Sequence, residues 1–267
     1  MQENLLLAFL LTLFAGLSTG FGGLIALFAR RTNTRFLSFS LGLSAGVMIY
    51  VSFVELFRES EVLLTAEWGD KTGLILTVLC FFAGIFFIGL IDRLVPSNEN
   101  PHEVKKIENM EEPLQKNQKL MKMGIVTALA ISIHNFPEGI ATFMTVLENP
   151  TLGVVIAVAI AIHNIPEGIA VAVPVYHATG NKKKAFYLSL LSGLAEPIGG
   201  LLAYAFLAPF ISSTLLGCVF AIVAGIMVFI SFDELLPTAH EYGEHHIAIY
   251  GLVVGMGIMA LSLILLM

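Results

Sequence analysis

The sequence is poor in charged residues. Only 13% of its 267 residues are Asp, Glu, Lys or Arg, about half the share that soluble domains carry. Hydrophobic residues make up 57% of the chain, and the mean hydropathy is +0.86. This composition excludes an ordinary water-soluble domain and indicates an integral membrane protein.

The sequence also has few cysteines and few stretches in which polar and apolar residues alternate. The only cysteines are Cys80 and Cys218, and both lie in apolar stretches. Two cysteines in such positions exclude a disulfide framework and a thiolate metal site, and we expect both to be small core residues. The apolar stretches are long and unbroken, whereas barrel strands alternate over about ten residues, so a transmembrane barrel is excluded as well.

The apolar stretches are long enough to cross a bilayer as helices, which takes about 20 residues for about 30 Å of hydrocarbon. We expect one all-α transmembrane domain over residues 1–267, with eight helices. Their expected ranges are 5–28, 36–57, 73–95, 120–146, 152–177, 185–207, 212–236 and 247–266. The one long polar stretch, 96–119, is expected to be a mobile cytoplasmic loop because it is rich in proline, asparagine and mixed charge.

The basic residues predict the orientation. All but two of the 14 Lys and Arg residues lie in or beside the connections after the first, third and fifth stretches. Basic connections prefer the cytoplasm, so both termini are expected on the outer side of an inner (plasma) membrane. The expected outward connections carry acidic residues whose field would attract cations. These are Glu55, Glu59, Glu61, Glu67, Asp70 and Glu148.

A ten-residue motif occurs twice within the apolar stretches. The copy "HNFPEGIATF" begins at His134, and "HNIPEGIAVA" begins at His163. Helical spacing places Glu138 on the same face as His134 and Asn135. The second copy repeats this spacing with His163, Asn164 and Glu167. Because the fourth and fifth helices run antiparallel, we expect the copies to face each other at mid-membrane as an inverted pair, as in many transporter sites.

These buried polar groups predict a metal site. An ionisable group at mid-membrane is unfavourable by a few kcal/mol, so each is a candidate functional residue. Pro137 and Pro166 free backbone carbonyls of the preceding turn, and no Lys or Arg lies in either copy of the motif. Nitrogen and oxygen donors of this kind suit a divalent metal, and Glu138 and Glu167 are placed to bridge two ions. The alternative is that polar side chains simply hold the helices together.

Further acidic and histidine residues extend the hypothesis. Glu196, in "GLAEPIGG", is expected to be another ligand, with a structural glutamate bonded to the backbone as the alternative. A candidate exit path toward the cytoplasm consists of His177, Asp233, Glu234 and His240. The alternatives there are a half-exposed helix end for the "SFDELLP" segment and a solvated turn for "HEYGEHH".

On the motifs "ALAISIHNFPEGIATF", "AIAIHNIPEGIAVA", "GLAEPIGG" and "SFDELLP", the chain resembles the ZIP (Zrt/Irt-like) family of divalent metal transporters over nearly its whole length. The resemblance implies a binuclear centre on the fourth to sixth helices. One site would contain His134, Glu138, His163 and Glu167. The second would contain Asn135, Glu138, Asn164, Glu167 and Glu196.

The resemblance also implies a homodimer and uptake into the cytoplasm. It implies a mobile unit of helices one, four, five and six that moves against helices two, three, seven and eight. In many relatives the connection between the third and fourth helices is rich in histidine, whereas here it holds only His102. A metal-sensing role for that connection is therefore not expected.

The predicted function is uptake of Zn²⁺ and related divalent cations, with Fe, Mn, Co and Cd as further substrates. Cu(I) is disfavoured because it prefers sulfur ligands. The alternative is an intramembrane metal-dependent hydrolase. Metalloproteases with the H-E-x-x-H motif place the glutamate directly after the first histidine, where this chain has Asn135 and Asn164. We therefore expect no enzyme, no catalytic cofactor and no nucleic-acid partner, and expect the metal ions and the bilayer as partners.

Overall fold

The computed structural model describes residues 4–28, 34–94, 113–207, 210, 212–242 and 245–266, and this part of the chain is helical throughout apart from short turns. The prediction of an all-α membrane fold is therefore confirmed. Before the long fifth helix come α1 (Leu5–Phe28), α2 (Thr34–Val51), η2 (Ser52–Leu56), α3 (Phe57–Trp68) and α4 (Asp70–Leu94). The rest are α5 (Pro113–Glu148), α6 (Pro150–Thr179), α7 (Lys182–Gly193), α8 (Ala195–Leu207), α9 (Ser213–Ile230), η5 (Ser231–Leu235), α10 (Leu236–Tyr242) and α11 (His245–Leu266). The segments η2 and η5 are π-helical turns.

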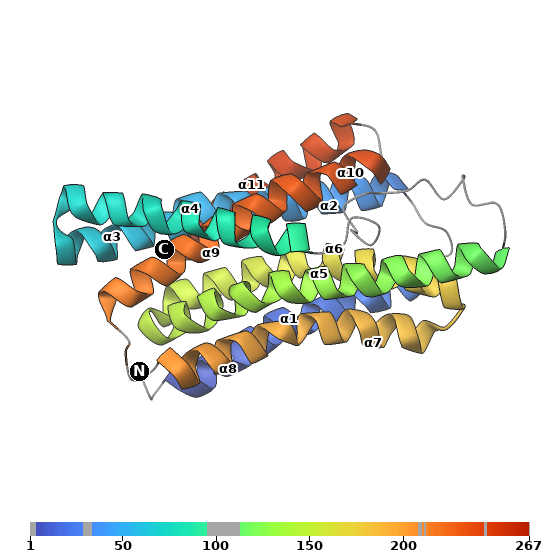
Figure 1. Cartoon of the computed structure of the whole chain (residues 1–267), viewed down its shortest axis with the longest axis horizontal. Coiled ribbons are helices and arrows are strands. Elements are labelled where there is room, and N and C mark those ends of the chain that lie inside the picture. The colour runs from blue at the N-terminus through green and yellow to red at the C-terminus, as the bar shows by residue number, and fades with distance from the viewer. Residues whose placement is uncertain are drawn as a thin grey trace.

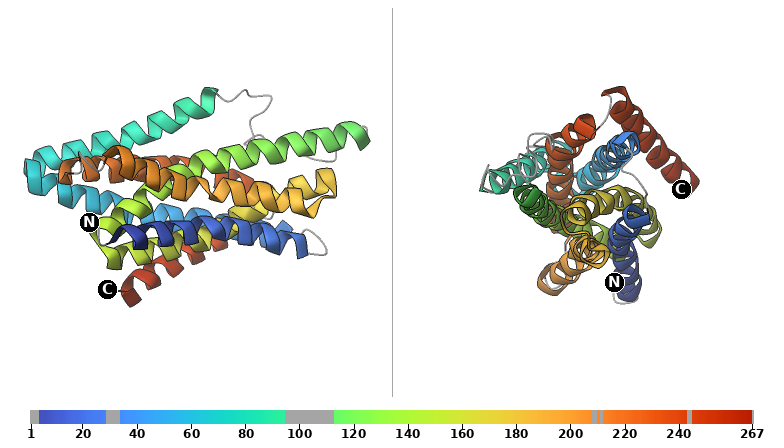
Figure 2. Two further views of the ribbon diagram at one scale, coloured as in Figure 1. Left: turned by 90° about the horizontal axis from the view of Figure 1, so that it is seen from below. Right: turned by 90° about the vertical axis from the view of Figure 1, so that its right-hand side faces the viewer.

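The helices lie lengthwise in one elongated bundle (Figure 1). Within the described residues, seven spans are long and apolar enough to cross a membrane, and α5 runs beside α6 in the opposite direction. Both ends of the chain lie at the same end of the bundle (Figures 1 and 2). Large apolar side chains such as Phe86 and Ile264 face outward with 73% of their surface exposed, as expected for residues that contact lipid.

Two expected boundaries are wrong. The second span does not end at Phe57 but continues through η2 and α3 to Trp68, so Glu55, Glu59 and their acidic neighbours lie on a helix and not in a loop. Only Gly69, with φ of 79°, separates α3 from α4. The continuation is stable because α3 packs against both α4 and α9. Helix α5 begins at Pro113, inside the stretch expected to be a loop, and residues 95–112 lie outside the described part.

The prolines of the two motifs do not interrupt their helices. Pro137 lies within continuous α5, and Pro166 lies within continuous α6. The sixth span is interrupted instead, at Leu194 between α7 and α8. Pro197 has no N–H to donate to the carbonyl of Gly193, four residues earlier, so the ladder of helical hydrogen bonds is broken at this point.

The helices form two groups according to which pack most closely. One group contains α1, α5, α6 and the α7–α8 span, and the other contains α2–α3, α4, α9–α10 and α11. Glycines allow backbones within each group to touch: an added Cβ at Gly22 would lie 2.0 Å from the carbonyl oxygen of Ile165, and one at Gly46 would lie 2.1 Å from that of Leu252. The groups meet along a seam in which α6 contacts α2 and α11, and α5 contacts α9.

Candidate metal centre

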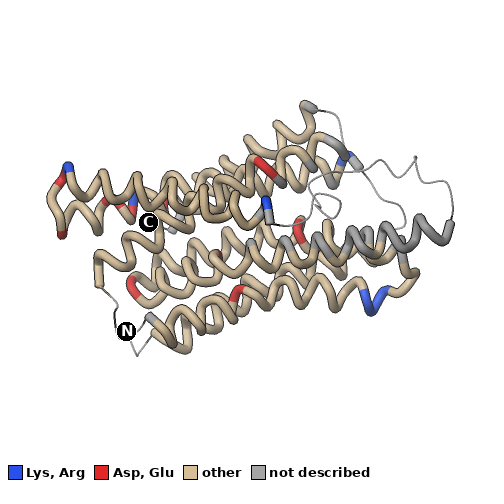
Figure 3. Tube along the Cα trace, in the orientation of Figure 1, with Lys and Arg blue, Asp and Glu red and all other residues tan. Residues whose placement is uncertain are grey.

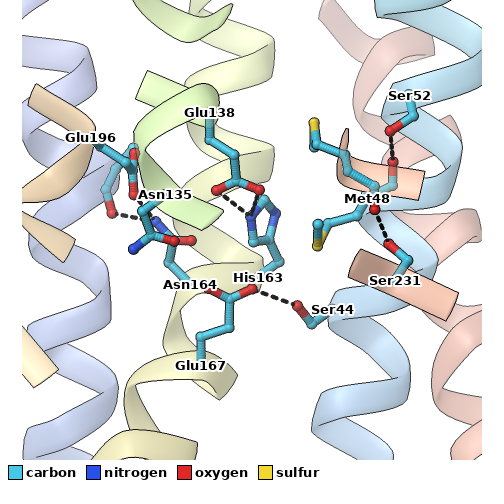
Figure 4. A network of polar contacts seen from close by, with 12 residues as sticks. Ser44, Met48, Ser52, Asn135, Glu138, His163, Asn164, Glu167, Glu196 and Ser231 are labelled. Atoms are coloured by element: carbon cyan, nitrogen blue, oxygen red, sulfur yellow. Dashed lines mark hydrogen bonds and ion pairs between the residues drawn. The ribbon is translucent and has the colours of Figure 1, made fainter. Parts of the chain in front are cut away.

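A histidine and a glutamate from the two motif copies meet between α5 and α6. The Nε2 atom of His163 lies 3.2 Å from Oε1 and 3.3 Å from Oε2 of Glu138 (Figure 4). Neither side chain exposes more than 1% of its surface. The two helices are antiparallel, and each motif therefore presents its polar face to the other at the middle of the bundle.

The two asparagines are oriented by backbone acceptors. The Asn135 amide donates to the carbonyl of Ser192 at 3.2 Å. The Asn164 amide donates to the carbonyl of Ala15 at 3.0 Å and also to Oε1 of Glu196. Because these amide groups donate, the Oδ1 atoms point elsewhere, and neither has a hydrogen-bond donor among the described side chains and backbone. Two fully buried amide oxygens are thus available to a ligand.

The third carboxylate of the centre comes from the interrupted span. Glu196 lies in the first turn of α8 and is fully buried. Helix α5 approaches it closely because Gly139 has no side chain: an added Cβ there would lie 2.0 Å from the Glu196 carbonyl oxygen. The interruption at Leu194 and this close contact bring Glu196 to the motif on α6.

The other group of helices contributes a residue that the sequence did not point to. Ser44 on α2 donates to Oε1 of Glu167 at 3.3 Å, across the seam. The thioether of Met48, one turn further along α2, points toward Glu138 and His163 (Figure 4). A serine and a methionine in an apolar stretch give no signal in the sequence, since both are ordinary residues of membrane helices.

The predicted ligands differ in how fully the structure describes them. Asn135, Glu138, His163, Asn164, Glu167 and Glu196 are all buried in one region. His134 lies on α5 beside Asn135, but its side chain is outside the described part. Among the side chains that are described, no three His, Cys, Asp or Glu residues converge closely enough to hold a metal ion. The described donors instead approach in pairs, Glu138 with His163 and Asn164 with Glu196.

The charge of this region is one-sided. It buries three carboxylates, one imidazole and two amides, and the two motif copies and the segment "GLAEPIGG" that carry them contain no Lys or Arg. Buried carboxylates are strongly unfavourable unless a cation or a proton neutralises them. Nitrogen and oxygen donors without thiolate suit a divalent cation that must bind and then leave.

The candidate exit residues lie further along the bundle. Asp233 is exposed on η5, and His240 is half-buried on α10. His177 lies near the end of α6 and Glu234 lies on η5, and the side chains of both are outside the described part. These four residues therefore remain a prediction.

A second repeated segment went unnoticed in the sequence. The pentapeptides "SFVEL" (Ser52–Leu56) and "SFDEL" (Ser231–Leu235) are the two π-helical turns. Their serines make the same hydrogen bond, from Ser52 to the Met48 carbonyl at 2.7 Å and from Ser231 to the Met227 carbonyl at 2.8 Å (Figure 4). Comparing the second and seventh spans would have revealed this repeat.

Comparison with known proteins identifies the family of this chain. Residues 93–263 match the family model described as ZIP Zinc transporter. Over its full length the chain is also similar to proteins that are named Zinc transporter ZupT. The relative from Oceanobacillus iheyensis is 62% identical over 267 residues, 99% of this chain and 100% of that protein.

Two further relatives carry the same name. The protein from Lysinibacillus sphaericus is 61% identical over 268 residues, 100% of each chain. The one from Streptococcus mutans is 58% identical over 265 residues, 99% of each chain. The expected resemblance to the ZIP family is confirmed, and the relatives are of the ZupT type. The hydrolase alternative is set aside because the family consists of transporters. The chain belongs to the ZIP family of zinc transporters.

Proposed function

We propose that this protein carries Zn²⁺, and related divalent cations such as Fe²⁺, Mn²⁺, Co²⁺ and Cd²⁺, across the inner membrane into the cytoplasm. The observation that carries the proposal is the buried cluster of carboxylate, imidazole and amide groups on α5, α6 and α8, in motifs that contain no Lys or Arg. A divalent cation is the partner that this charge requires. The names of the relatives support zinc as a substrate.

The proposed ligands form two adjacent sites. His134, Glu138, His163 and Glu167 hold one ion, and Asn135, Asn164 and Glu196 hold a second together with the same two glutamates. Support comes from the contact between Glu138 and His163 and from the available Oδ1 atoms of the asparagines. Glu138 and Glu167 bridge the two ions in this arrangement.

The proposed orientation has both termini outside. Arg93, at the end of α4, and Lys182–Lys184, at the start of α7, lie away from the end of the bundle that holds the termini (Figure 3). Basic connections prefer the cytoplasmic side. In this orientation the ion leaves past the candidate exit residues His177, Asp233, Glu234 and His240. The connection between α4 and α5 lies on the cytoplasmic side.

The proposed transport cycle moves one group of helices against the other. The family resemblance implies a mobile unit of α1, α5, α6 and α7–α8, and these same helices form one of the two closely packed groups. A homodimer, also implied by the resemblance, belongs to the proposal. The ion can leave only if the sites bind it with moderate affinity, and oxygen-rich sites bind divalent cations in this way.

The test is zinc uptake into proteoliposomes. Glu138→Gln and Glu167→Gln keep the size of each side chain but remove a charge, and we expect each to reduce the rate of uptake at least about tenfold, the factor that corresponds to about 1.4 kcal/mol. The control is Glu67→Gln, because Glu67 is exposed on α3 and should transport as the wild type does. Size-exclusion chromatography checks that all the variants fold.

Two results of this experiment would show that the proposed site is wrong. One is that the wild type accumulates no zinc, and the other is that both glutamine variants transport as fast as Glu67→Gln. A Zn²⁺-dependent rise in melting temperature that disappears in both glutamine variants would separate a loss of binding from a loss of movement.

A further inference from the structure

A polar cavity lies at the end of the bundle that holds the chain termini, apart from the metal centre. Its volume is about 330 Å³, and it is bounded by η2, α3, the start of α6 and the end of α11. The polar residues on its wall are Glu55, Arg58, Glu59, Asn149 and Thr151. It therefore opens on the seam where the two groups of helices meet.

Glu55 is the unusual residue of this cavity. Its side chain is 8% exposed, and it lines the cavity. Within the described residues its carboxylate makes no hydrogen bond and no ion pair, although Arg58 and Glu59 are near enough to act on it electrostatically. A buried carboxylate directed into a polar cavity without a partner is unfavourable unless a cation occupies the cavity.

The charges around the cavity favour a cation. Glu55 and Glu59 are four residues apart, so they lie on the same face of a helix. Glu148 is near enough to act on Glu59, and among the described residues of the wall Arg58 is the only basic one. Three carboxylates against one guanidinium leave an excess of two negative charges, which attracts cations from solution.

The π-helical turn explains why Glu55 faces the cavity. A π-helical turn adds a residue to the helix, which changes the direction of the side chains that follow. Such turns are frequent at functional sites, and this one carries Glu55. The Ser52 hydroxyl stabilises it by donating to the Met48 carbonyl at 2.7 Å.

Two elements, helix α6 and the span formed by α2 and η2, contribute residues to both the cavity and the metal centre. Helix α6 lines the cavity with Val155 and contributes His163 eight residues later, which corresponds to about 12 Å along the helix. On the facing span, Glu55 lies eleven residues beyond Ser44, which corresponds to about 16 Å. Between these levels both elements present buried apolar residues, including Val51 and Ile156. Along both elements the cavity thus lies on the terminal side of the centre, with buried apolar residues between the two.

We propose that Glu55 and Glu59 form a capture site that holds a hydrated divalent cation before it enters the centre. The assignment of this site to the entrance depends on the proposed function, because uptake then begins at the end of the bundle that holds the termini. Six waters occupy about 180 Å³ at about 30 Å³ each, so the ion fits the cavity with most of its water. Carboxylates and water give weak binding, which suits a site that must pass its ion onward.

The first test measures zinc uptake as a function of zinc concentration. For Glu55→Gln we expect the apparent KM to rise about fivefold, the effect of losing one nearby charge, with little change in the maximal rate. Glu59→Gln should act in the same direction. The matched control is Glu67→Gln, exposed on the same α3 helix and not part of the cavity wall, which should keep the wild-type KM.

A second test does not require transport. Purified protein carrying Glu138→Gln and Glu167→Gln is titrated with Mn²⁺, and free Mn²⁺ is followed by electron paramagnetic resonance. We expect a weak Mn²⁺ site in this background that disappears when Glu55→Gln is added. If the site persists, or if Glu55→Gln retains the KM of a transporting wild type, the capture site is wrong. If the wild type shows no zinc uptake, the proposed function is wrong, and the Mn²⁺ titration would still show whether Glu55 binds a cation.

Discussion

At the scale of single residues, the orientation of the two asparagine side chains could not be predicted from the sequence. Sequence spacing predicted that Asn135 and Asn164 lie on the same faces as the glutamates, but it could not tell which atoms would be available. That depends on the carbonyls of Ser192 and Ala15, which come from distant parts of the chain. Because these carbonyls fix the amide donors, the Oδ1 atoms are oriented before any ion arrives. Such preorganisation reduces the entropy lost on binding.

Replacing Asn164 tests this role. We expect Asn164→Ala to weaken zinc binding about tenfold, because it removes an oriented oxygen and a donor to Glu196. Zinc stabilises the folded state in proportion to the logarithm of its excess over Kd, so a tenfold weaker site loses about 1.4 kcal/mol of that stabilisation. The measurement is the rise in melting temperature when zinc is added to the protein in detergent.

A second asparagine serves as the control. Asn181 caps α7, and its side chain accepts from the backbone N–H of Lys184 at 3.1 Å. Asn181→Ala should reduce the stability of the metal-free protein by about 1 kcal/mol and leave the zinc-dependent rise intact. If Asn164→Ala keeps the full zinc-dependent rise, the asparagine is a packing residue and not a ligand.

At the scale of helices, the positions of the spans could be predicted because they depend on composition. Features that depend on contacts between helices could not. The apolar lengths were enough to place the spans, and α1 has the predicted range, Leu5–Phe28. The continuation of the second span through α3 depends on contacts with α4 and α9, which no local pattern reports. The helices stay continuous at Pro137 and Pro166 because neighbouring helices stabilise a turn that has lost one hydrogen bond.

The approach of α5 to α8 is a test of packing at this scale. We expect Gly139→Ala to destabilise the protein strongly or to displace Glu196, because the new Cβ would lie 2.0 Å from a backbone oxygen that cannot rotate away. Overpacking of this kind typically reduces stability by about 1–3 kcal/mol. The measurement is the melting temperature in detergent together with the KM for zinc uptake.

The matched change is Gly257→Ala in α11. No atom lies within 4 Å of a Cβ added at Gly257, so this variant should be as stable as the wild type or slightly more stable, since alanine favours a helix over glycine. Equal stability of Gly139→Ala and Gly257→Ala would show that α5 and α8 are not in the close contact that brings Glu196 to the centre.

At the scale of the whole molecule, the centre and the capture site both lie on the seam between the two groups of helices. Glu167 of one group accepts from Ser44 of the other, and the cavity around Glu55 is bounded by α6 of one group and by η2 and α3 of the other. Neither relation was visible in the sequence, because the seam joins the second span to the fifth. Movement along this seam would open and close the path of an ion without disturbing the packing inside either group.

Cross-linking tests whether transport requires that movement. The thiols of Cys80 on α4 and Cys218 on α9 lie near each other within one group, so joining them with a short bifunctional thiol reagent should leave zinc uptake unchanged. A cysteine pair across the seam, Ile133→Cys on α5 and Ile226→Cys on α9, replaces residues of one apolar cluster and is made in a background with Cys80→Ser and Cys218→Ser. Uptake by this variant should stop after cross-linking and return when the link is reduced. Continued uptake with the seam pair fully cross-linked would mean that the ion crosses a fixed pathway, and that the two groups of helices do not move against each other.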